Sequence, residues 1–271
     1  MTPELSEKDK KLKARIEKSL EKFDLSFEAR GRRLFGLLPR DPRCTLCLSP
    51  FEGVGATLVR VLMNKRRSTL NPLMCNACEE LLRKLRYGKE MEMSMLFADM
   101  RGSTSLAESM NPTEFKDLID RFYNEATHVL VHSYAVIDKL AGDEVSGYYL
   151  PGMVGEDFAR KSVQAGLDVL RVTGHADPGG PWAPVGVGIH TGNAYYGAVS
   201  SRDGLVEMTA LGDAVNIAAR LASQAARGEL VISERTAQKA GVDTSKLEKR
   251  TLDLKGKSEP MDVWVMRVTG N

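Results

Sequence analysis

Four cysteines, arranged in two close pairs, constrain the first third of this chain more than any other feature. The stretches "CTLC" (44–47) and "CNAC" (75–78) are separated by 27 residues. Each Cys-x-x-Cys pair forms a knuckle whose sulfurs point to one side, and two such knuckles complete a tetrahedral thiolate site. The pattern therefore predicts a metal-binding module whose ligands are Cys44, Cys47, Cys75 and Cys78.

Four thiolates can hold more than one kind of occupant. Zinc is the metal we favour, because closed four-cysteine sites of this kind commonly hold it. An iron–sulfur cluster also uses four thiolates and stays as the alternative. A disulfide pair is a third reading, which a reducing compartment disfavours.

Charge divides the chain near the end of the cysteine region. Residues 1–90 carry 20 Lys and Arg against 12 Asp and Glu, whereas residues 91–271 carry 18 against 24. All four cysteines lie in the basic part. We therefore predict an N-terminal helical segment (1–38), a four-cysteine metal-binding module (39–88) and a larger domain (91–271).

The stretch from residue 4 to residue 23 is typical of an amphipathic helix. Its apolar residues recur at helical intervals and form one narrow stripe, made of Leu5, Leu12, Ile16, Leu20 and Phe23. The polar face carries acids as well as bases. We therefore expect a helix that docks on protein rather than on a membrane surface.

The composition of the chain limits its class. No apolar run approaches the ~18 residues of a membrane span, and the start of the chain lacks the apolar centre of a signal peptide. With 42% hydrophobic and 27% charged residues, the chain is typical of a globular protein, and we expect it in the cytoplasm with no transmembrane segment. The basic run "NKRRS" (64–68) raises the alternative of a nucleic-acid-binding zinc protein, although such runs are more often solvated loops.

The second part of the chain alternates strand and helix patterns. A buried strand (93–98) is followed by a helix (111–130), two strands joined at Ala141–Asp143, a helix (156–173) and a strand (184–192). This order, β-α-β-β-α-β, is the ferredoxin-like arrangement. We predict an α+β domain of this type with a C-terminal extension, preceded by a small helical, zinc-ribbon-like domain.

Two acidic residues stand where this arrangement brings strands together. Asp99 follows the first strand, and Asp143 lies at the tip of the hairpin. Each alone is typical of a turn. Held close together they would repel each other unless a divalent cation sat between them, and hard oxygen ligands suit Mg²⁺ or Mn²⁺.

Four stretches carry a resemblance to a known family. The motifs "FADMRGST" (97–104), "DKLAGDEV" (138–145), "VGVGIHTG" (185–192) and "TALGDAVNIAARL" (209–221) resemble the catalytic domain of the class III nucleotidyl cyclases, over residues 91–268. The resemblance implies synthesis of cyclic AMP or cyclic GMP from the nucleoside triphosphate, with two Mg²⁺ or Mn²⁺ ions in each active site. It also implies that Asp99 and Asp143 bind these ions.

The loop after Asp99 fits a phosphate-binding role. Gly102 lets the backbone come close to a ligand, and the amides of Gly102, Ser103 and Thr104 are expected to meet the β- and γ-phosphates as a helix opens behind them. By resemblance, Lys255 in "DLKGKSEP" is the family's phosphate-binding lysine.

Asn216 and Arg220 are four residues apart and share one helical face. By resemblance, Asn216 orients the ribose and Arg220 stabilises the charge that develops on the α-phosphate, a task that suits the planar donors of a guanidinium. Asp213, just after Gly212, is expected to be a helix N-cap.

Two positions are expected to read the base. Lys139 matches the lysine of adenylyl cyclases, whereas guanylyl cyclases usually place an acid there. Thr209 stands where many adenylyl cyclases have Asp, a departure found in a subset of the family. Adenine and guanine present opposite hydrogen-bond donors and acceptors on the base edge that these residues are expected to contact. The two residues are therefore expected to decide which nucleotide is the substrate.

The resemblance implies a two-fold homodimer with two shared active sites. One protomer would provide Asp99 and Asp143, and the other Lys139, Thr209, Asn216 and Arg220. We therefore predict an adenylate cyclase that converts ATP to 3′,5′-cyclic AMP and pyrophosphate, with the metal module as a candidate regulator. The alternatives are a guanylate cyclase, a catalytically silent cyclase-like scaffold and the nucleic-acid-binding zinc protein.

Overall fold

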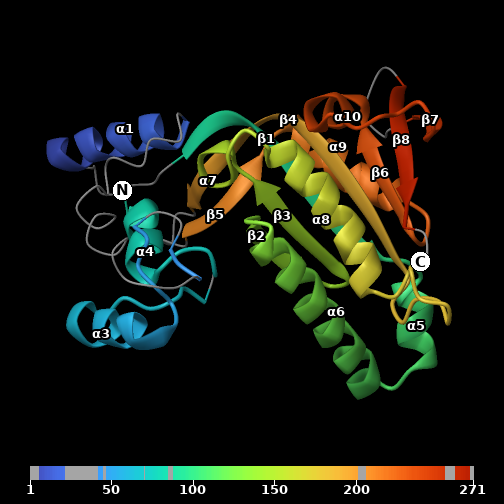
Figure 1. Cartoon of the computed structure of the whole chain (residues 1–271), viewed down its shortest axis with the longest axis horizontal. Coiled ribbons are helices and arrows are strands. Elements are labelled where there is room, and N and C mark those ends of the chain that lie inside the picture. Colours follow the sequence, from blue (N-terminus) through green and yellow to red (C-terminus); the bar gives the residue numbers. More distant parts are fainter. Residues whose placement is uncertain are drawn as a thin grey trace. The chain divides into compact units, whose positions relative to one another are not determined.

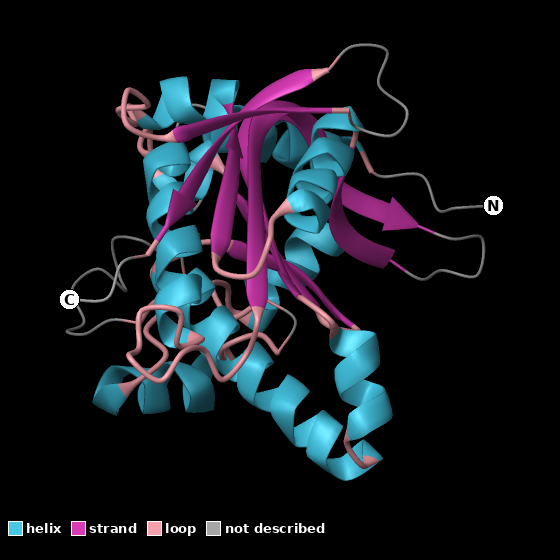
Figure 2. Ribbon diagram, turned by 90° about the vertical axis from the view of Figure 1, so that its right-hand side faces the viewer, coloured by secondary structure: helices cyan, strands magenta, loops and turns pink. Residues whose placement is uncertain are grey.

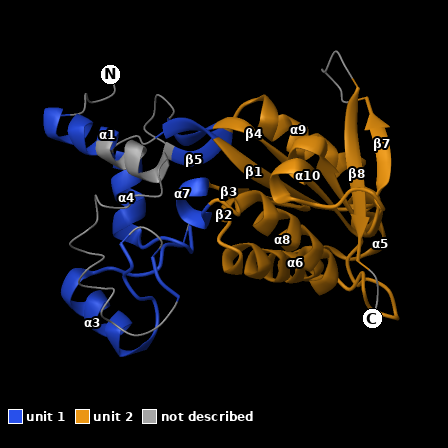
Figure 3. Ribbon diagram, turned by 45° about the horizontal axis from the view of Figure 1, so that its top comes forward, with its two compact units in different colours: residues 1–91, 151–155, 195–210 blue, residues 92–150, 156–194, 211–271 orange. Residues whose placement is uncertain are grey.

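The computed structural model describes residues 6–21, 42–44, 47–69, 71–84, 88–200, 206–253 and 260–268. Its helices and strands are labelled in Figure 1. The chain divides into two compact units, coloured in Figure 3. Unit 1 comprises residues 1–91, 151–155 and 195–210, and unit 2 comprises residues 92–150, 156–194 and 211–271. The domain limits expected from the sequence stay a prediction.

The chain from residue 88 to residue 200 has the predicted order of elements. Strand β1 (Gly88–Met100) is followed by helices α5 (Ser103–Ser109) and α6 (Pro112–His132), strands β2 (Val136–Ala141) and β3 (Glu144–Tyr149), helix α8 (Phe158–Val172) and strand β4 (Val185–Ser200). The strands lie in the order β2-β3-β1-β4. The ferredoxin-like prediction is confirmed, although β1 begins five residues before the expected strand.

Local sequence explains where these elements begin and end. Asn111 caps α6 by accepting hydrogen bonds from the amides of Thr113 and Glu114, while the Glu114 carboxylate accepts one from the Asn111 amide. This capping box, with Pro112 at the first helical position, fixes the start of α6. Strand β1 is buried from residue 93 to residue 98, which is why its sequence there is apolar except for Ser94, whose hydroxyl shares a 2.7 Å hydrogen bond with the Thr191 hydroxyl.

Helices cover both faces of the sheet of unit 2 (Figure 2). Helix α8 packs on one face, where a Cβ added to Gly166 would lie 3.0 Å from Leu230 and 3.1 Å from Ile189. Helix α9 (Asp213–Gln224) packs against β4 at Gly188. Because Gly188 and Ile189 are successive residues of one strand, they point to opposite faces. Helices α8 and α9 therefore lie on opposite sides of the sheet.

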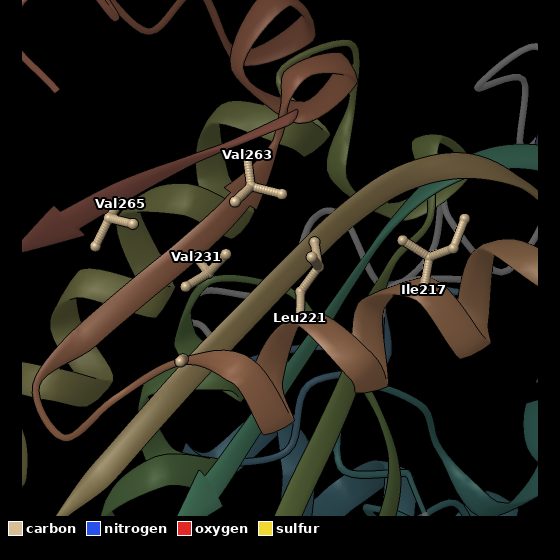
Figure 4. Close-up of a cluster of buried hydrophobic side chains, with 6 residues drawn as sticks. Ile217, Leu221, Val231, Val263 and Val265 are labelled. Carbon is tan, nitrogen blue, oxygen red and sulfur yellow. The ribbon is translucent and has the colours of Figure 1, made fainter. Parts of the chain in front are cut away.

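The C-terminal extension continues the sheet. Strand β6 (Glu229–Ser233) pairs in parallel with β4, and β8 (Met261–Arg267) pairs antiparallel with both β6 and β7 (Glu248–Leu252). Helix α10 (Glu234–Ala240) follows β6 and is capped by the Ser233 hydroxyl. Between α9 and these strands lies an apolar cluster made of Ile217, Leu221, Ala225, Val231, Val263 and Val265 (Figure 4).

An ion network ties the three strands of the extension together. The Glu229 carboxylate is 5% exposed, accepts two 2.7 Å hydrogen bonds from Arg250 and also pairs with Arg267. The hydrogen bonds from Arg250 are the main cause that lowers the pKa of Glu229 to about 2, against the opposing effect of burial. The charged form of Glu229 therefore stabilises the junction of β6, β7 and β8.

Unit 1 contains helices α1 (Glu7–Glu21), α3 (Gly53–Met63), α4 (Asn76–Lys84) and α7 (Pro151–Val154). Helix α1 falls within the helix predicted for residues 4–23. Strand β5 (Val206–Leu211) pairs with β4. No helix among the described residues combines the length and the apolar character that crossing a bilayer requires.

Candidate functional site

The end of β1 and the tip of the β2–β3 hairpin bring Asp99 and Asp143 together. Asp99 pairs with Glu144 across the β1–β3 ladder, and Asp143 directly precedes Glu144. The Met100 amide donates a 3.0 Å hydrogen bond to the Asp143 carbonyl. The Tyr123 hydroxyl of α6 donates one of 2.8 Å to the Gly142 carbonyl. The hairpin tip is therefore held beside the end of β1, as the sequence predicts.

The electrostatics of this site favour a cation. Burial raises the pKa of Asp99, and the Asp143 carboxylate raises it further, while Arg101 opposes both. Burial also raises the pKa of the neighbouring Glu144, as do Asp99 and Asp143. Carboxylates that destabilise one another's charged forms suit a divalent cation with oxygen ligands, so the residues present fit Mg²⁺ or Mn²⁺.

Two residues of this site were missed by the sequence analysis. Glu144 faces Asp99 because it is the first residue of β3. The only sequence feature that could have identified Glu144 is its position directly after Asp143. Arg101 forms an ion pair with the Asp99 carboxylate, and its guanidinium also donates a 3.1 Å hydrogen bond to the Ser223 carbonyl in the last turn of α9. The sequence feature that could have identified Arg101 is a basic residue two positions after Asp99.

The loop after β1 has the backbone shape that its glycine permits. Gly102 has φ +70°, a left-handed conformation, and has open space where a Cβ would be. It caps α5, which begins at Ser103. Ser103 is half-buried and Thr104 exposed. The turn places all three next to Asp99, while their contact with phosphate stays a prediction.

Helix α9 presents Asn216 and Arg220. Asn216 is exposed and Arg220 half-buried, and within the described part of the chain neither side chain makes a hydrogen bond or an ion pair. Both are therefore available to a ligand. The expected N-cap is wrong: Gly212 is the cap and Asp213 the first helical residue, because the chain turns at Gly212, where φ is +141°.

The remaining predicted substrate-binding residues belong to different parts of the chain. Lys139 is exposed on β2 in unit 2. Thr209 is buried on β5 and belongs to unit 1. Lys255 lies outside the described residues. Their common action on one substrate stays a prediction.

The four cysteines of unit 1 converge as the sequence predicts. Their sulfur atoms all lie within 4.8 Å of one another, and Cys47 Sγ is 3.8 Å from Cys75 Sγ. All four side chains are buried and all four thiols are free, so the disulfide reading is not supported. The group could hold a metal ion.

Hydrogen bonds among the four thiols lower the pKa of Cys47 and Cys75 and raise the pKa of Cys44 and Cys78. Lys65 Nζ donates a 3.6 Å hydrogen bond to Cys47 Sγ. The hydrogen bond with the Cys44 thiol lowers the pKa of Cys47 to about 7, and hydrogen bonds with the other thiols, Cys44 first, hold the pKa of Cys75 below its usual range. Because thiolates are the form of cysteine that binds metals, the lowered pKa values of Cys47 and Cys75 suit a metal cation.

The basic loop between the knuckles is used within unit 1. The Asn76 side chain accepts from the Arg66 amide at 2.9 Å and donates to the Asn64 carbonyl at 3.1 Å. Arg67 donates to the Pro72 carbonyl at 2.8 Å and lies over the Phe51 ring. With Lys65 on Cys47, two of the three cations of "NKRRS" have partners within the protein. This counts against a nucleic-acid patch.

The fold and the site agree with comparisons to known proteins. Residues 86–267 match the family model of the adenylate and guanylate cyclase catalytic domain. The chain therefore belongs to the adenylate and guanylate cyclase family, the class III cyclases.

Among curated proteins, the chain is similar to an adenylate cyclase of Mycobacterium tuberculosis, with 30% identity over 179 residues. The match covers 65% of this chain and 39% of the mycobacterial protein. An adenylate cyclase of Anabaena cylindrica is 28% identical over 188 residues, 65% of this chain and 36% of the relative. The chain thus spans about two fifths of the length of the curated relatives it matches.

Solved structures include cyclases of both specificities. The guanylyl cyclase Cya2 superposes with a TM-score of 0.59 at 27% identity, over 66% of this chain and 92% of that one. The adenylyl cyclase CyaB from P. aeruginosa gives a TM-score of 0.58 at 25% identity, over 68% of this chain and 97% of that one. These matches confirm the predicted cyclase fold and leave the choice of nucleotide to the site residues.

Proposed function

We propose that this chain is an adenylate cyclase that converts ATP to 3′,5′-cyclic AMP and pyrophosphate. The observation that carries the proposal is that Asp143, at the tip of the β2–β3 hairpin, lies beside Asp99 at the end of β1. The Asp143 carbonyl accepts a hydrogen bond from the Met100 amide and the Gly142 carbonyl accepts one from the Tyr123 hydroxyl, so the hairpin tip is held beside Asp99 before a cation arrives. Such preorganisation is what metal-assisted phosphoryl chemistry requires.

In this reaction the ribose 3′-oxygen forms a bond to the α-phosphorus, the bond from that phosphorus to the pyrophosphate oxygen breaks, and the hydroxyl proton passes to solvent. When bound, the metal ions make the hydroxyl more acidic and neutralise phosphate charge. Asp99 and Asp143 hold them. No protein nucleophile takes part.

The other residues bind and orient the triphosphate. The amides of Gly102, Ser103 and Thr104 hold the phosphates, with Lys255 as a further cation. Asn216 orients the ribose, and the Arg220 guanidinium donates to the α-phosphate oxygens as their charge grows. The absence of any partner for Asn216 and Arg220 among the described residues supports this assignment, because both side chains remain free to bind.

The sites are shared in a homodimer. One protomer provides Asp99 and Asp143, and the other provides Lys139, Thr209, Asn216 and Arg220. The free side chains of α9 are the support for this arrangement. A two-fold dimer then contains two equivalent sites.

ATP is the substrate because residue 139 is a lysine, whereas guanylyl cyclases usually have an acidic side chain at this position. The experiment is an assay of purified protein with ATP or GTP and Mn²⁺, analysed for cyclic nucleotide. Cyclic AMP should dominate, and Lys139→Glu should lower ATP turnover far more than GTP turnover. Preferential formation of cyclic GMP by the wild type would favour the alternative, a guanylate cyclase, which the similarity to the guanylyl cyclase Cya2 supports. No product from either nucleotide would favour a silent scaffold.

The cysteine cluster holds one zinc ion. A tetrahedral site with zinc–sulfur bonds of about 2.3 Å has sulfur–sulfur edges of about 3.8 Å, the separation of Cys47 Sγ and Cys75 Sγ. A four-iron cluster would hold its cysteine sulfurs roughly 6 Å apart, farther than the 4.8 Å limit of this group. Elemental analysis should find one zinc per chain and no visible absorption. Iron with sulfide and a brown colour would overturn the assignment.

A further inference from the structure

We infer that Arg101 is an internal cation that occupies the Asp99 carboxylate until a metal ion displaces it, and that it ties this carboxylate to helix α9. The inference rests on the proposed function, because it takes Asp99 to be a metal ligand. Arg101 is then a positioning residue of the metal site.

Both Nη atoms of the Arg101 guanidinium interact with acceptors. One Nη pairs with Asp99 Oδ2, and the other donates to the Ser223 carbonyl at 3.1 Å. The backbone amide of Arg101 donates to the Pro184 carbonyl at 2.5 Å, which fixes the start of the side chain. The Arg101 and Asp99 side chains are only 23% and 24% exposed, so water competes weakly for this pair. A planar fork of donors is suited to bridging a carboxylate and a carbonyl.

The Ser223 carbonyl is a favourable place for a cation. Helix α9 ends at Gln224, so this carbonyl is one of the last four and has no acceptor role within the helix. The C-terminal end of a helix also carries partial negative charge. Arg101 therefore completes the end of α9 and neutralises Asp99 at the same time. Helix α9 also carries Asn216 and Arg220, seven and three residues before Ser223.

A metal ion and the guanidinium compete for Asp99. Both are positively charged, and two cations on one carboxylate repel each other at close range. Metal binding therefore requires Arg101 to leave Asp99, which lowers the affinity of the empty site. The guanidinium that leaves is the one bound to α9, so occupation of the metal site changes the environment of the last turn of α9.

The first test measures Mn²⁺ binding to the nucleotide-free, full-length protein from the resonance signal of free Mn²⁺. Arg101→Gln should bind Mn²⁺ about five-fold more tightly than wild type, the size expected for loss of a partly exposed ion pair. The matched control is Arg171→Gln, which removes the exposed pair with Asp168 on α8 and should change nothing. Asp99→Asn reports whether the Mn²⁺ is bound at this site at all.

The outcomes separate the inference from the proposed function. If Asp99→Asn binds Mn²⁺ as wild type does, Asp99 is not a metal ligand and the proposed function fails. If Asp99→Asn loses binding while Arg101→Gln binds as tightly as wild type or less tightly, the competition is wrong and the proposed function stands. Circular dichroism checks that each variant is folded.

The second test reads the link to α9 by hydrogen exchange. Mn²⁺ should increase exchange in the last turn of α9 in wild type, and Arg101→Gln should show the increase without Mn²⁺. Arg101→Lys keeps the positive charge but lacks the second donor that reaches the Ser223 carbonyl. It should therefore bind Mn²⁺ with wild-type affinity, while hydrogen exchange in the last turn of α9 should be raised without Mn²⁺. Exchange that responds to neither Mn²⁺ nor the substitutions would overturn the link.

Discussion

Gly188 of β4 lies so close to Ala222 of α9 that an added Cβ would stand 2.0 Å from the Ala222 nitrogen. The neighbouring Gly186 has the same relation to the Ala225 carbonyl, at 2.7 Å. No side-chain movement can relieve such contacts, because the obstructing atoms are backbone. The glycines of "VGVGIHTG" thus let α9 rest directly on the sheet, and this contact positions Asn216 and Arg220.

Gly188→Ala should push α9 away from β4. Overpacking of this kind costs about 1–3 kcal/mol, so the free energy of unfolding should fall by that amount, measured by urea denaturation. The cyclase rate should fall further than the loss of folded protein explains, because displaced reacting groups cost about 100-fold per ångström. Gly179→Ala is the control, since its Cβ would enter open space. Wild-type rate and stability in Gly188→Ala would contradict this account of α9.

Removal of either candidate metal ligand should abolish activity without unfolding the protein. Asp99→Ala or Asp143→Ala should lower the rate at least ~100-fold, because metal charge stabilisation is worth several kcal/mol. Asp120→Asn, on the exposed face of α6, should keep the wild-type rate. The measurement is cyclic AMP formation with Mn²⁺ at fixed protein concentration. More than about a tenth of the wild-type rate in either alanine variant would be incompatible with metal catalysis at this pair.

Mixed protomers should recover activity that each variant lacks alone. Asp99→Ala and Arg220→Ala are each expected to be inactive as homodimers. In a heterodimer one of the two shared sites is intact, so an equal mixture after refolding together should show roughly a quarter of the wild-type rate. Absence of recovery in heterodimers verified by two affinity tags would exclude shared sites of this composition.

Glu229 should give the stability of the protein a distinct acid dependence. Its folded pKa is about 2, below the ordinary value of 4.5, so its contribution is present above pH 4.5 and is lost as the pH falls toward 2. Glu229→Gln should destabilise the protein at pH 7 by about 2–3 kcal/mol and should flatten the stability curve between pH 4.5 and pH 2. Urea denaturation across that range makes the comparison, with Glu234→Gln on the exposed start of α10 as control. Parallel curves for wild type and Glu229→Gln would show that the network does not act on stability.

Periodicity and turn chemistry were enough to predict the ferredoxin-like core. The buried run of β1, the hairpin around Gly142 and the amphipathic face of α6 are local features, each visible within about 20 residues. The position of Asp143 beside Asp99 followed from these elements and their order. The convergence of the four cysteines followed from the spacing of the knuckles.

What the sequence did not reveal depends on contacts between distant residues. Nothing in the motif "VGVGIHTG" indicates that Gly188 meets Ala222, because the approach depends on how α9 lies on β4. Glu229 meets Arg250 and Arg267 across 21 and 38 residues, and three separate strands must pair before these charges become neighbours. Arg101 turns back onto Asp99 only because β1 ends at Met100. The domain limits and the joint action of Lys139, Thr209 and Lys255 stay predictions.

The cysteine cluster has a consequence for the chain as a polymer. A metal ion bound there would be a cross-link between Cys47 and Cys75, closing a loop of 27 intervening residues that includes all of α3. Such a closure restricts the unfolded chain, and its stabilising effect grows with the concentration of free metal by mass action. The lifetime of unit 1 against proteolysis would then depend on the concentration of free metal. When metal is scarce, the amount of intact protein would fall, even if the catalytic rate of each remaining active site is unchanged.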